Sequence, residues 1–374
     1  MTRPATLAYS PALDGIRAFA VLAVMFYHGG TSWAGGGFLG VDVFFVLSGF
    51  LITSLLLIEF EQAGRLDLRA FWGRRARRLL PALFLVLVAV LLYATFLVGE
   101  AASAVRSDAL ATLFYVSNWW FIASGNSYFE QFQDPSPLTH TWSLAIEEQW
   151  YLLLPLVLVL LLPRWRRSRL AWTFAGLAVL SALEMAWLAS PQTDASRVYY
   201  GTDTRLQALL VGAALAAVLT PGVLQKVRVA AAWAGPAALV GLIGFMLLIS
   251  DQSAWMYDGG FLAFAGSSAL LLASVQAHPD GFVARIFSTR PVVWIGRISY
   301  GLYLWHWPVY VVLSPARTGL SGIGLLTLRF AVTFAIATAS YYWVELPVRR
   351  GALQRFTSRQ RVAVVLGAPL AIVA

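Results

Sequence analysis

Two ionisable residues near the N-terminus, Arg17 and His28, lie in one apolar stretch and could do chemistry together. Their separation of eleven residues predicts that both side chains share one face of an α-helix, about 16 Å apart along its axis. Ionisable side chains inside a membrane are costly and are read first as functional. We therefore predict that Arg17 marks the inner mouth of a tunnel and that His28 acts at its depth.

An imidazole with an ordinary pKa of about 6.5 is a natural general base for deprotonating a hydroxyl group at neutral pH. The glycines that follow, Gly29 and Gly30, would let another chain approach His28 closely. The alternative is structural, because a histidine in a transmembrane helix often only forms hydrogen bonds between helices.

The composition requires that these residues be placed by membrane helices. Of the 374 residues, 59% are hydrophobic and 12% are charged, about half the charged fraction of a soluble domain. The net charge of +9 does not indicate nucleic acid, because the arginines gather in short loops between apolar segments, as the positive-inside rule predicts. Cysteine is absent, which excludes disulfides and thiolate chemistry.

We expect an all-α membrane protein of ten transmembrane helices, with an N-terminus in the cytoplasm and a location in the cytoplasmic membrane. The predicted spans are 16–34, 40–58, 82–98, 144–162, 171–189, 204–219, 229–249, 258–276, 292–314 and 323–343, with an eleventh from 362. Residues 99–143 are predicted to form a re-entrant or interfacial element, because a crossing there would turn the later arginine clusters outward.

An arginine cluster precedes the third span and includes Arg74, Arg75 and Arg78. The simpler interpretation is that it only retains its loop in the cytoplasm and contacts anionic lipid. Against this, an Arg-x-x-Arg spacing puts two guanidinium groups on one face of a helix, which suits bidentate binding of phosphate. Arg74, Arg75 and Arg78 are therefore candidates for binding a phosphate group, and the topological interpretation stays open.

A second polar group surrounds the start of the fourth span and contains His140, Trp142, Ser143 and Glu147. Ser143 is predicted to cap that helix, and Glu147 then lies near the first turn, where the helix dipole favours negative charge. A role for Glu147 in orienting an acceptor hydroxyl or in moving a proton is equally compatible with the sequence. Glu147 is accordingly a catalytic candidate, and Trp142 and Ser143 are substrate or structural candidates.

A third group comes from the ninth span, where Tyr303 and His306 lie one helical turn apart. His306 is the stronger candidate for a site, since aromatic side chains here are also typical of a membrane interface. Asp14, beside Arg17, and Asp42, at the start of the second span, complete the candidates. Motifs of P-loops, dinucleotide-binding folds, zinc helices and nucleophile elbows are missing from the sequence, which indicates group transfer without a metal.

These separated motifs, taken together, resemble the acyltransferase 3 family of integral-membrane acyltransferases. The resemblance rests on Leu13–Ala18 with His28, on Gly36–Leu51, on Arg74–Pro81, on Trp142–Leu144 with Glu147, and on Tyr300–Pro308. It extends over residues 10–350, which we therefore take as the membrane acyltransferase domain.

The resemblance implies transfer of an acyl group, usually acetyl, from cytoplasmic acyl-CoA to a hydroxyl of an envelope glycan or an exported metabolite. By the family pattern, His28 would be the base, Arg17 its companion, and Arg75 and Arg78 the residues that bind the CoA phosphates. Members with an eleventh span often carry an outer domain of the Ser-Gly-Asn-His type. Residues 351–374 are accordingly predicted to be a basic cytoplasmic linker and the start of a span that leads to such a domain.

A different function class also remains open. A proton-coupled transporter of a small solute could use His28, Glu147 and His306 as a proton relay. The irregular stretch at 99–143 would suit a transporter, whereas the one-sided arginine cluster and the lack of an inverted repeat do not. The sequence specifies neither the acceptor nor an oligomeric state.

Overall fold

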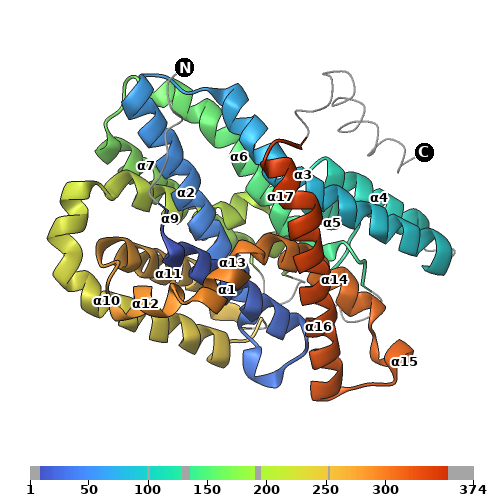
Figure 1. Ribbon diagram of the computed structural model, residues 1–374. Coiled ribbons are helices and arrows are strands. Elements are labelled where there is room, and N and C mark those ends of the chain that lie inside the picture. The colour runs from blue at the N-terminus through green and yellow to red at the C-terminus, as the bar shows by residue number, and fades with distance from the viewer. Residues whose placement is uncertain (1–8, 99–101, 129–134, 190–194, 252, 353–374) are drawn as a thin grey trace. The chain divides into compact units, whose positions relative to one another are not determined.

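The computed structural model describes residues 9–98, 102–128, 135–189, 195–251 and 253–352 (Figure 1). The regular elements in these ranges are all helices, so the prediction of an all-α protein is confirmed. The chain divides into two compact units. The first unit contains Met1–Leu68 and Ile146–Ser299, and the second contains Arg69–Ala145 and Tyr300–Ala374.

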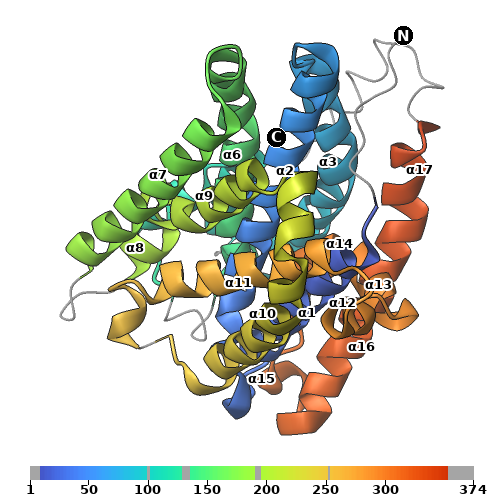
Figure 2. The ribbon, with the colours of Figure 1, turned by 90° about the vertical axis from the view of Figure 1, so that its left-hand side faces the viewer.

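The first unit contains most of the long helices and can be followed in Figure 2. Its α-helices are α1 (Pro11–His28), α2 (Gly40–Ala63), most of α6 (Trp142–Leu161), α7 (Arg167–Leu188), α8 (Ser196–Tyr200), α9 (Thr202–Val218), α10 (Pro221–Leu248), α11 (Gly260–Ala277), α12 (Phe282–Phe287) and α13 (Arg290–Arg297). Short 3₁₀ turns at Ser32–Ala34, Gly37–Leu39 and Ala254–Met256 connect them. Helices α7 and α9 lie side by side, as do α10 and α11.

The second unit is built around α3 (Leu68–Tyr93) and the C-terminal helices. Its other α-helices are α4 (Ala102–Leu113), α5 (Ser117–Ala123), α14 (Ser299–Val312), α15 (Pro315–Thr318), α16 (Gly322–Ser340) and α17 (Leu346–Arg349). A 3₁₀ turn at Thr139–Thr141 leads into α6, and π-helical turns follow α3 at Ala94–Val98 and α16 at Tyr341–Glu345. The second π-helical turn joins α16 to α17 in one continuous column (Figure 1).

Seven helical segments among the described residues are long and apolar enough to cross a membrane, so we treat the chain as an integral membrane protein. They are Gly37–Ala63, Leu68–Leu97, Thr139–Leu161, Arg167–Leu188, Pro221–Leu248, Gly260–Ala277 and Gly322–Arg349. Helices α1, α9 and α14 overlap predicted spans but are not among these seven, so the number of ten is not confirmed. The predicted eleventh span, from residue 362, lies outside the described residues.

The predicted first span, 16–34, is wrong at both ends. Helix α1 begins at Pro11 and ends at His28, so His28 is its last residue and not a residue of its interior. The amides of Gly29 and Gly30 bond back to the carbonyls of Met25 and Tyr27, and Gly30 has a φ of 71°. Gly30 therefore ends the helix through a left-handed conformation that other residues adopt at a cost. The expected close approach of another chain is not seen at Gly30, because a Cβ at this position would have no other atom within 4 Å.

The predicted span 292–314 is also wrong, because Ile298 separates it into α13 and α14. Helix α13 is amphipathic, with arginines at both ends and Val293 and Gly296 buried. Hydropathy averaged over the whole stretch does not distinguish this amphipathic helix from the apolar α14 that follows. Residues 99–143 agree better with expectation. Among its described residues, the short helices α4 and α5 are not spanning candidates, whereas residues 139–143 belong to the candidate Thr139–Leu161.

Small residues allow the helices of the first unit to pack closely. A Cβ on Gly49 of α2 would lie 2.0 Å from the carbonyl oxygen of Leu209, and one on Gly212 of α9 would lie 2.0 Å from that of Val46. A Cβ on Gly296 of α13 would lie 1.8 Å from the carbonyl oxygen of Asp14. Such contacts between backbones are how helices associate in lipid, where the hydrophobic effect does not drive them together.

Candidate active site

A chain of polar contacts fixes the N-terminal end of α1. Arg17 Nη1 donates to Asp14 Oδ1 at 2.7 Å, one turn earlier in the helix. The other carboxylate oxygen of Asp14 accepts a bond of 2.8 Å from the Tyr9 hydroxyl, which in turn accepts from Arg297 Nη2 at 3.1 Å. The carboxylate of Asp14 thus orients the guanidinium group of Arg17, so Asp14 has a structural role.

His28 lies at the opposite end of the same uninterrupted helix and is only 5% exposed. Its neighbour Tyr27 donates a hydrogen bond of 2.6 Å to Asp251 Oδ2, which holds this end of α1 to the segment after α10. The negative end of the helix dipole favours the positive charge that an imidazole acquires when it accepts a proton. The imidazole is therefore enclosed by protein at the C-terminal end of α1.

Glu147 of α6 is held by two hydroxyl groups. The hydroxyls of Ser48, on α2, and of Tyr151, one turn further along α6, both donate to Glu147 Oε1. Ser48 and Tyr151 also contact each other at 2.9 Å. Helix α6 begins at Trp142, so Glu147 lies in its second turn, close to the first turn as expected, whereas Ser143 lies inside the helix and not at its N-cap position. Hydroxyl donors thus orient this carboxylate within the membrane helices.

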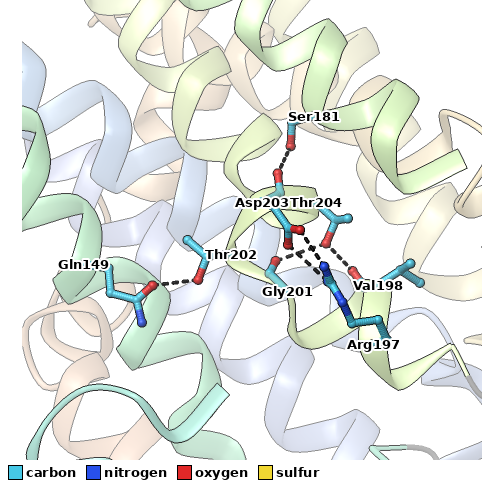
Figure 3. A network of polar contacts seen from close by, with 8 residues as sticks. All are labelled: Gln149, Ser181, Arg197, Val198, Gly201, Thr202, Asp203 and Thr204. Atoms are coloured by element: carbon cyan, nitrogen blue, oxygen red, sulfur yellow. Dashed lines mark hydrogen bonds and ion pairs between the residues drawn. The ribbon is translucent and has the colours of Figure 1, made fainter. Parts of the chain in front are cut away.

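A polar network beside Glu147 fixes the turn that enters α9 (Figure 3). Gln149 of α6 accepts from Thr202 at 2.6 Å, while the hydroxyl of Ser181 on α7 donates to the carbonyl of Asp203. Arg197 forms two bonds to the Asp203 carboxylate, at 2.6 and 3.1 Å. Burial alone would raise the pKa of Asp203, but the hydrogen bonds and the charge of Arg197 outweigh it and hold this pKa below its ordinary value.

The same turn places Arg205 opposite Asp42. Arg205 Nη2 donates to Asp42 Oδ2 at 2.8 Å, and the side chains are 0% and 1% exposed. The guanidinium carbon lies 4.3 Å from the centre of the Phe261 ring and 4.8 Å from that of Tyr199, which adds cation–π attraction. Asp42, predicted as a substrate or structural candidate, is thus one half of a buried ion pair that joins α2 to α9.

The second unit brings together four other residues that the sequence analysis named. Tyr303 donates to the carbonyl of His140 at 3.0 Å, and the hydroxyls of Ser143 and Tyr303 lie 2.6 Å apart. Ser143 is therefore bound to α14 and is not the predicted helix cap. The rings of His140 and His306 lie 5.4 Å apart, and each bonds through one ring nitrogen to a carbonyl oxygen of α14.

Trp142 is buried at the start of α6, where its ring meets the edge of Tyr128 at 6.1 Å. This contact, together with the bond between Ser143 and Tyr303, ties the beginning of α6 to neighbouring elements of the second unit. Both residues therefore have a packing role.

The arginine cluster lies within α3 and not in a loop before it. Arg75 and Arg78 are partly buried on one face, as the Arg-x-x-Arg spacing predicts, and Arg75 lies 5.9 Å from the ring of Phe71. Arg74 projects from an exposed position. The cluster belongs to the second unit, whereas Arg17, His28 and Glu147 belong to the first.

Some partners of the predicted residues could not be found by inspection of the sequence. Tyr151 could have been identified from the sequence, because a residue four positions after Glu147 shares its helical face. Ser48 and Arg205 were not, since they lie 99 and 163 residues from Glu147 and Asp42. Tyr9 and Arg297 were also missed, and they meet only because α13 packs on α1.

Helices long enough to cross a membrane, together with buried polar clusters inside the bundle, define the class as polytopic membrane proteins with an internal site. A family model described as an acyltransferase domain, the acyltransferase 3 model, matches residues 10–343. The chain belongs to this family, as the motifs around Arg17, His28 and Arg75 predicted. Family membership does not favour the transporter alternative.

Curated relatives extend the comparison. The chain is 44% identical over 349 residues to the peptidoglycan O-acetyltransferase OatA of Listeria monocytogenes serovar 1/2a, covering 91% of this chain and 56% of the relative. It is 43% identical over 359 residues to the putative peptidoglycan O-acetyltransferase YrhL of Bacillus subtilis, covering 94% and 56%. The chain thus spans a little over half the length of these relatives. No solved structure gives a significant match.

Proposed function

We propose that this chain is the membrane part of an O-acetyltransferase that uses cytoplasmic acyl-CoA, with acetyl-CoA as the usual donor. Its acceptor would be a hydroxyl group of an envelope glycan, peptidoglycan by similarity to the relatives, reached from the outer face. The observation that carries the proposal is the single helix α1, which has the oriented Arg17 near one end and the enclosed His28 at the other.

In the proposed reaction, the acceptor oxygen attacks the carbonyl carbon of the thioester while His28 accepts the hydroxyl proton. The new C–O bond forms, the C–S bond breaks, and the CoA thiolate takes a proton from the imidazolium. The products are an O-acetyl ester and free CoA, with no net gain or loss of protons. Glu147, oriented by Ser48 and Tyr151, would accept a hydrogen bond from the acceptor sugar or assist the proton transfer.

The CoA phosphates are too hydrophilic to enter lipid, so the donor would stay at the cytoplasmic face while its thin pantetheine arm threads toward His28. Arg75 and Arg78 are proposed to bind these phosphates, supported by their shared, partly buried face. Arg74, which is exposed, would contribute charge at the same surface.

Sealed membrane vesicles of known orientation test the function. Labelled acetyl-CoA is supplied to the cytoplasmic or to the outer face, and labelled ester in glycan is measured after mild alkaline release. The proposal expects label in glycan only from cytoplasmic acetyl-CoA. Equal labelling from both faces, or solute uptake by the chain without any acyl-CoA, would contradict it.

A further inference from the structure

Helix α13 separates its residues into two chemically different faces. Arg290, Trp294 and Arg297 follow one another at spacings of four and three residues, so they share one face. The opposite face is buried against α1, where Gly296 approaches the backbone of Asp14. Both figures show α12 and α13 beside α1 (Figures 1 and 2). The packing of α13 therefore leaves a cationic and aromatic face exposed.

This face forms one wall of a pocket of about 290 Å³, open on one side. The residues that line the pocket are Tyr9, Pro11, Ser288, Arg290, Val293, Trp294 and Arg297. Two guanidinium groups, two aromatic rings and two hydroxyl groups line it, and the lining includes no carboxylate. Arginine suits bidentate contact with phosphate, and aromatic rings stack on nucleobases whatever the base. This combination is chemically compatible with a phosphorylated nucleoside.

A chain of hydrogen bonds joins the lining of the pocket to Arg17. Arg297 and Tyr9, which line the pocket, are joined by a hydrogen bond of 3.1 Å, and Tyr9 bonds at 2.8 Å to the carboxylate that holds Arg17. Helix α1 leads from this end to His28, about 16 Å beyond Arg17. A ligand with its nucleotide in the pocket would therefore start its acyl-bearing arm at the Arg17 end of the helix.

We propose that the pocket of Arg290, Trp294 and Arg297 binds the adenosine 3′-phosphate end of acyl-CoA. This inference rests on the proposed donor and goes beyond it by assigning a nucleotide site separate from Arg75 and Arg78. CoA carries a separate 3′-phosphate, and the proposed pocket for it lies within the first unit. The pocket is too small for the whole donor, which leaves the pantetheine arm outside it.

The first test is direct binding. Adenosine 3′,5′-bisphosphate is titrated by calorimetry into the full chain held in nanodiscs of phosphatidylcholine. Arg290→Gln and Trp294→Leu change exposed side chains and are each expected to weaken binding about tenfold, through loss of a charge-assisted bond and of base stacking. Arg285→Gln removes the same charge from an exposed position on α12 and serves as the matched control, with wild-type affinity expected.

The second test compares acetyl-CoA with acetyl-pantetheine, which lacks the nucleotide. The two pocket variants should raise the ratio of the KM for acetyl-CoA to that for acetyl-pantetheine about tenfold. Unchanged bisphosphate affinity in both variants would overturn the site. The site would also be overturned if the two variants lost bisphosphate affinity only in nanodiscs that contain phosphatidylglycerol. The pocket would then bind the phosphate of a lipid. If wild-type binds the bisphosphate through these residues but turns over no acetyl-CoA, the site stands and the proposed function fails.

Discussion

The buried pair of Asp42 and Arg205 gives a prediction whose size follows from the structure. In Asp42→Ala, the guanidinium of Arg205 stays enclosed at 0% exposure and loses its counter-charge. Removing one partner of such a pair costs about 3–5 kcal/mol. The rings of Phe261 and Tyr199 contact the guanidinium in the wild-type as well, so their cation–π attraction cancels in the comparison and the lower end of this range is the conservative figure. We therefore expect a loss of about 3 kcal/mol in the free energy of unfolding.

The assay is reversible unfolding of the purified chain in mixed micelles, followed by far-UV circular dichroism. The double variant Asp42→Ala with Arg205→Met removes both charges and should recover most of the loss, since no unpaired charge stays buried. Asp280→Ala, at an exposed carboxylate, is the control and should lie within about 0.5 kcal/mol of wild-type. A loss below about 1 kcal/mol in Asp42→Ala, or a double variant less stable than the single, would refute the reasoning.

Three further predictions concern other parts of the first unit. Ser48→Ala and Tyr151→Phe should each lower kcat roughly tenfold at unchanged KM for acetyl-CoA. The reason is that each removes a hydrogen bond to a charged group, which contributes about 1.5–3 kcal/mol. A changed KM with constant kcat would contradict the role of these hydroxyls in orienting Glu147. The depressed pKa of Asp203 stabilises the folded state above its unfolded value of about 3.9, and this contribution is lost as the pH falls through the folded pKa. Arg197→Gln should therefore lower Tm at pH 7 and flatten the fall in Tm below pH 4, and an unaltered acid profile would count against it. Gly212→Leu would place a Cβ 2.0 Å from a backbone carbonyl oxygen of α2. It should lower the free energy of unfolding by at least about 1–3 kcal/mol, measured by thermal unfolding. A wild-type Tm would disprove the close packing.

The sequence predicted features that depend on residues near one another in the chain. The placement of Arg17 and His28 on one helix followed from spacing alone, and α1 contains both. The shared face of Arg75 and Arg78 followed in the same way, and both are partly buried. Helical periodicity is a local property, so such predictions need no knowledge of the fold.

Helix ends and distant partners were harder. His28 was expected at mid-helix because the apolar stretch continues past it, yet a left-handed Gly30 stops the helix. Hydropathy cannot detect that conformation. The partners Ser48 and Arg205 come from helices distant in the chain, and one sequence carries no signal that relates them to Glu147 and Asp42. Only the packed arrangement of α2, α6 and α9 reveals these pairs.

The most direct test of the mechanism is the rate of acetyl transfer by His28→Ala. Wild-type and variant chains in nanodiscs are mixed with labelled acetyl-CoA and a soluble glycan acceptor, and ester formation is followed within one turnover. Donor binding and the thermal unfolding of the variant are measured alongside. We predict a rate lower by about 10²–10⁴-fold, with donor affinity and folding retained. A folded, donor-binding variant that transfers acetyl within threefold of the wild-type rate would contradict the assignment of His28 as the base.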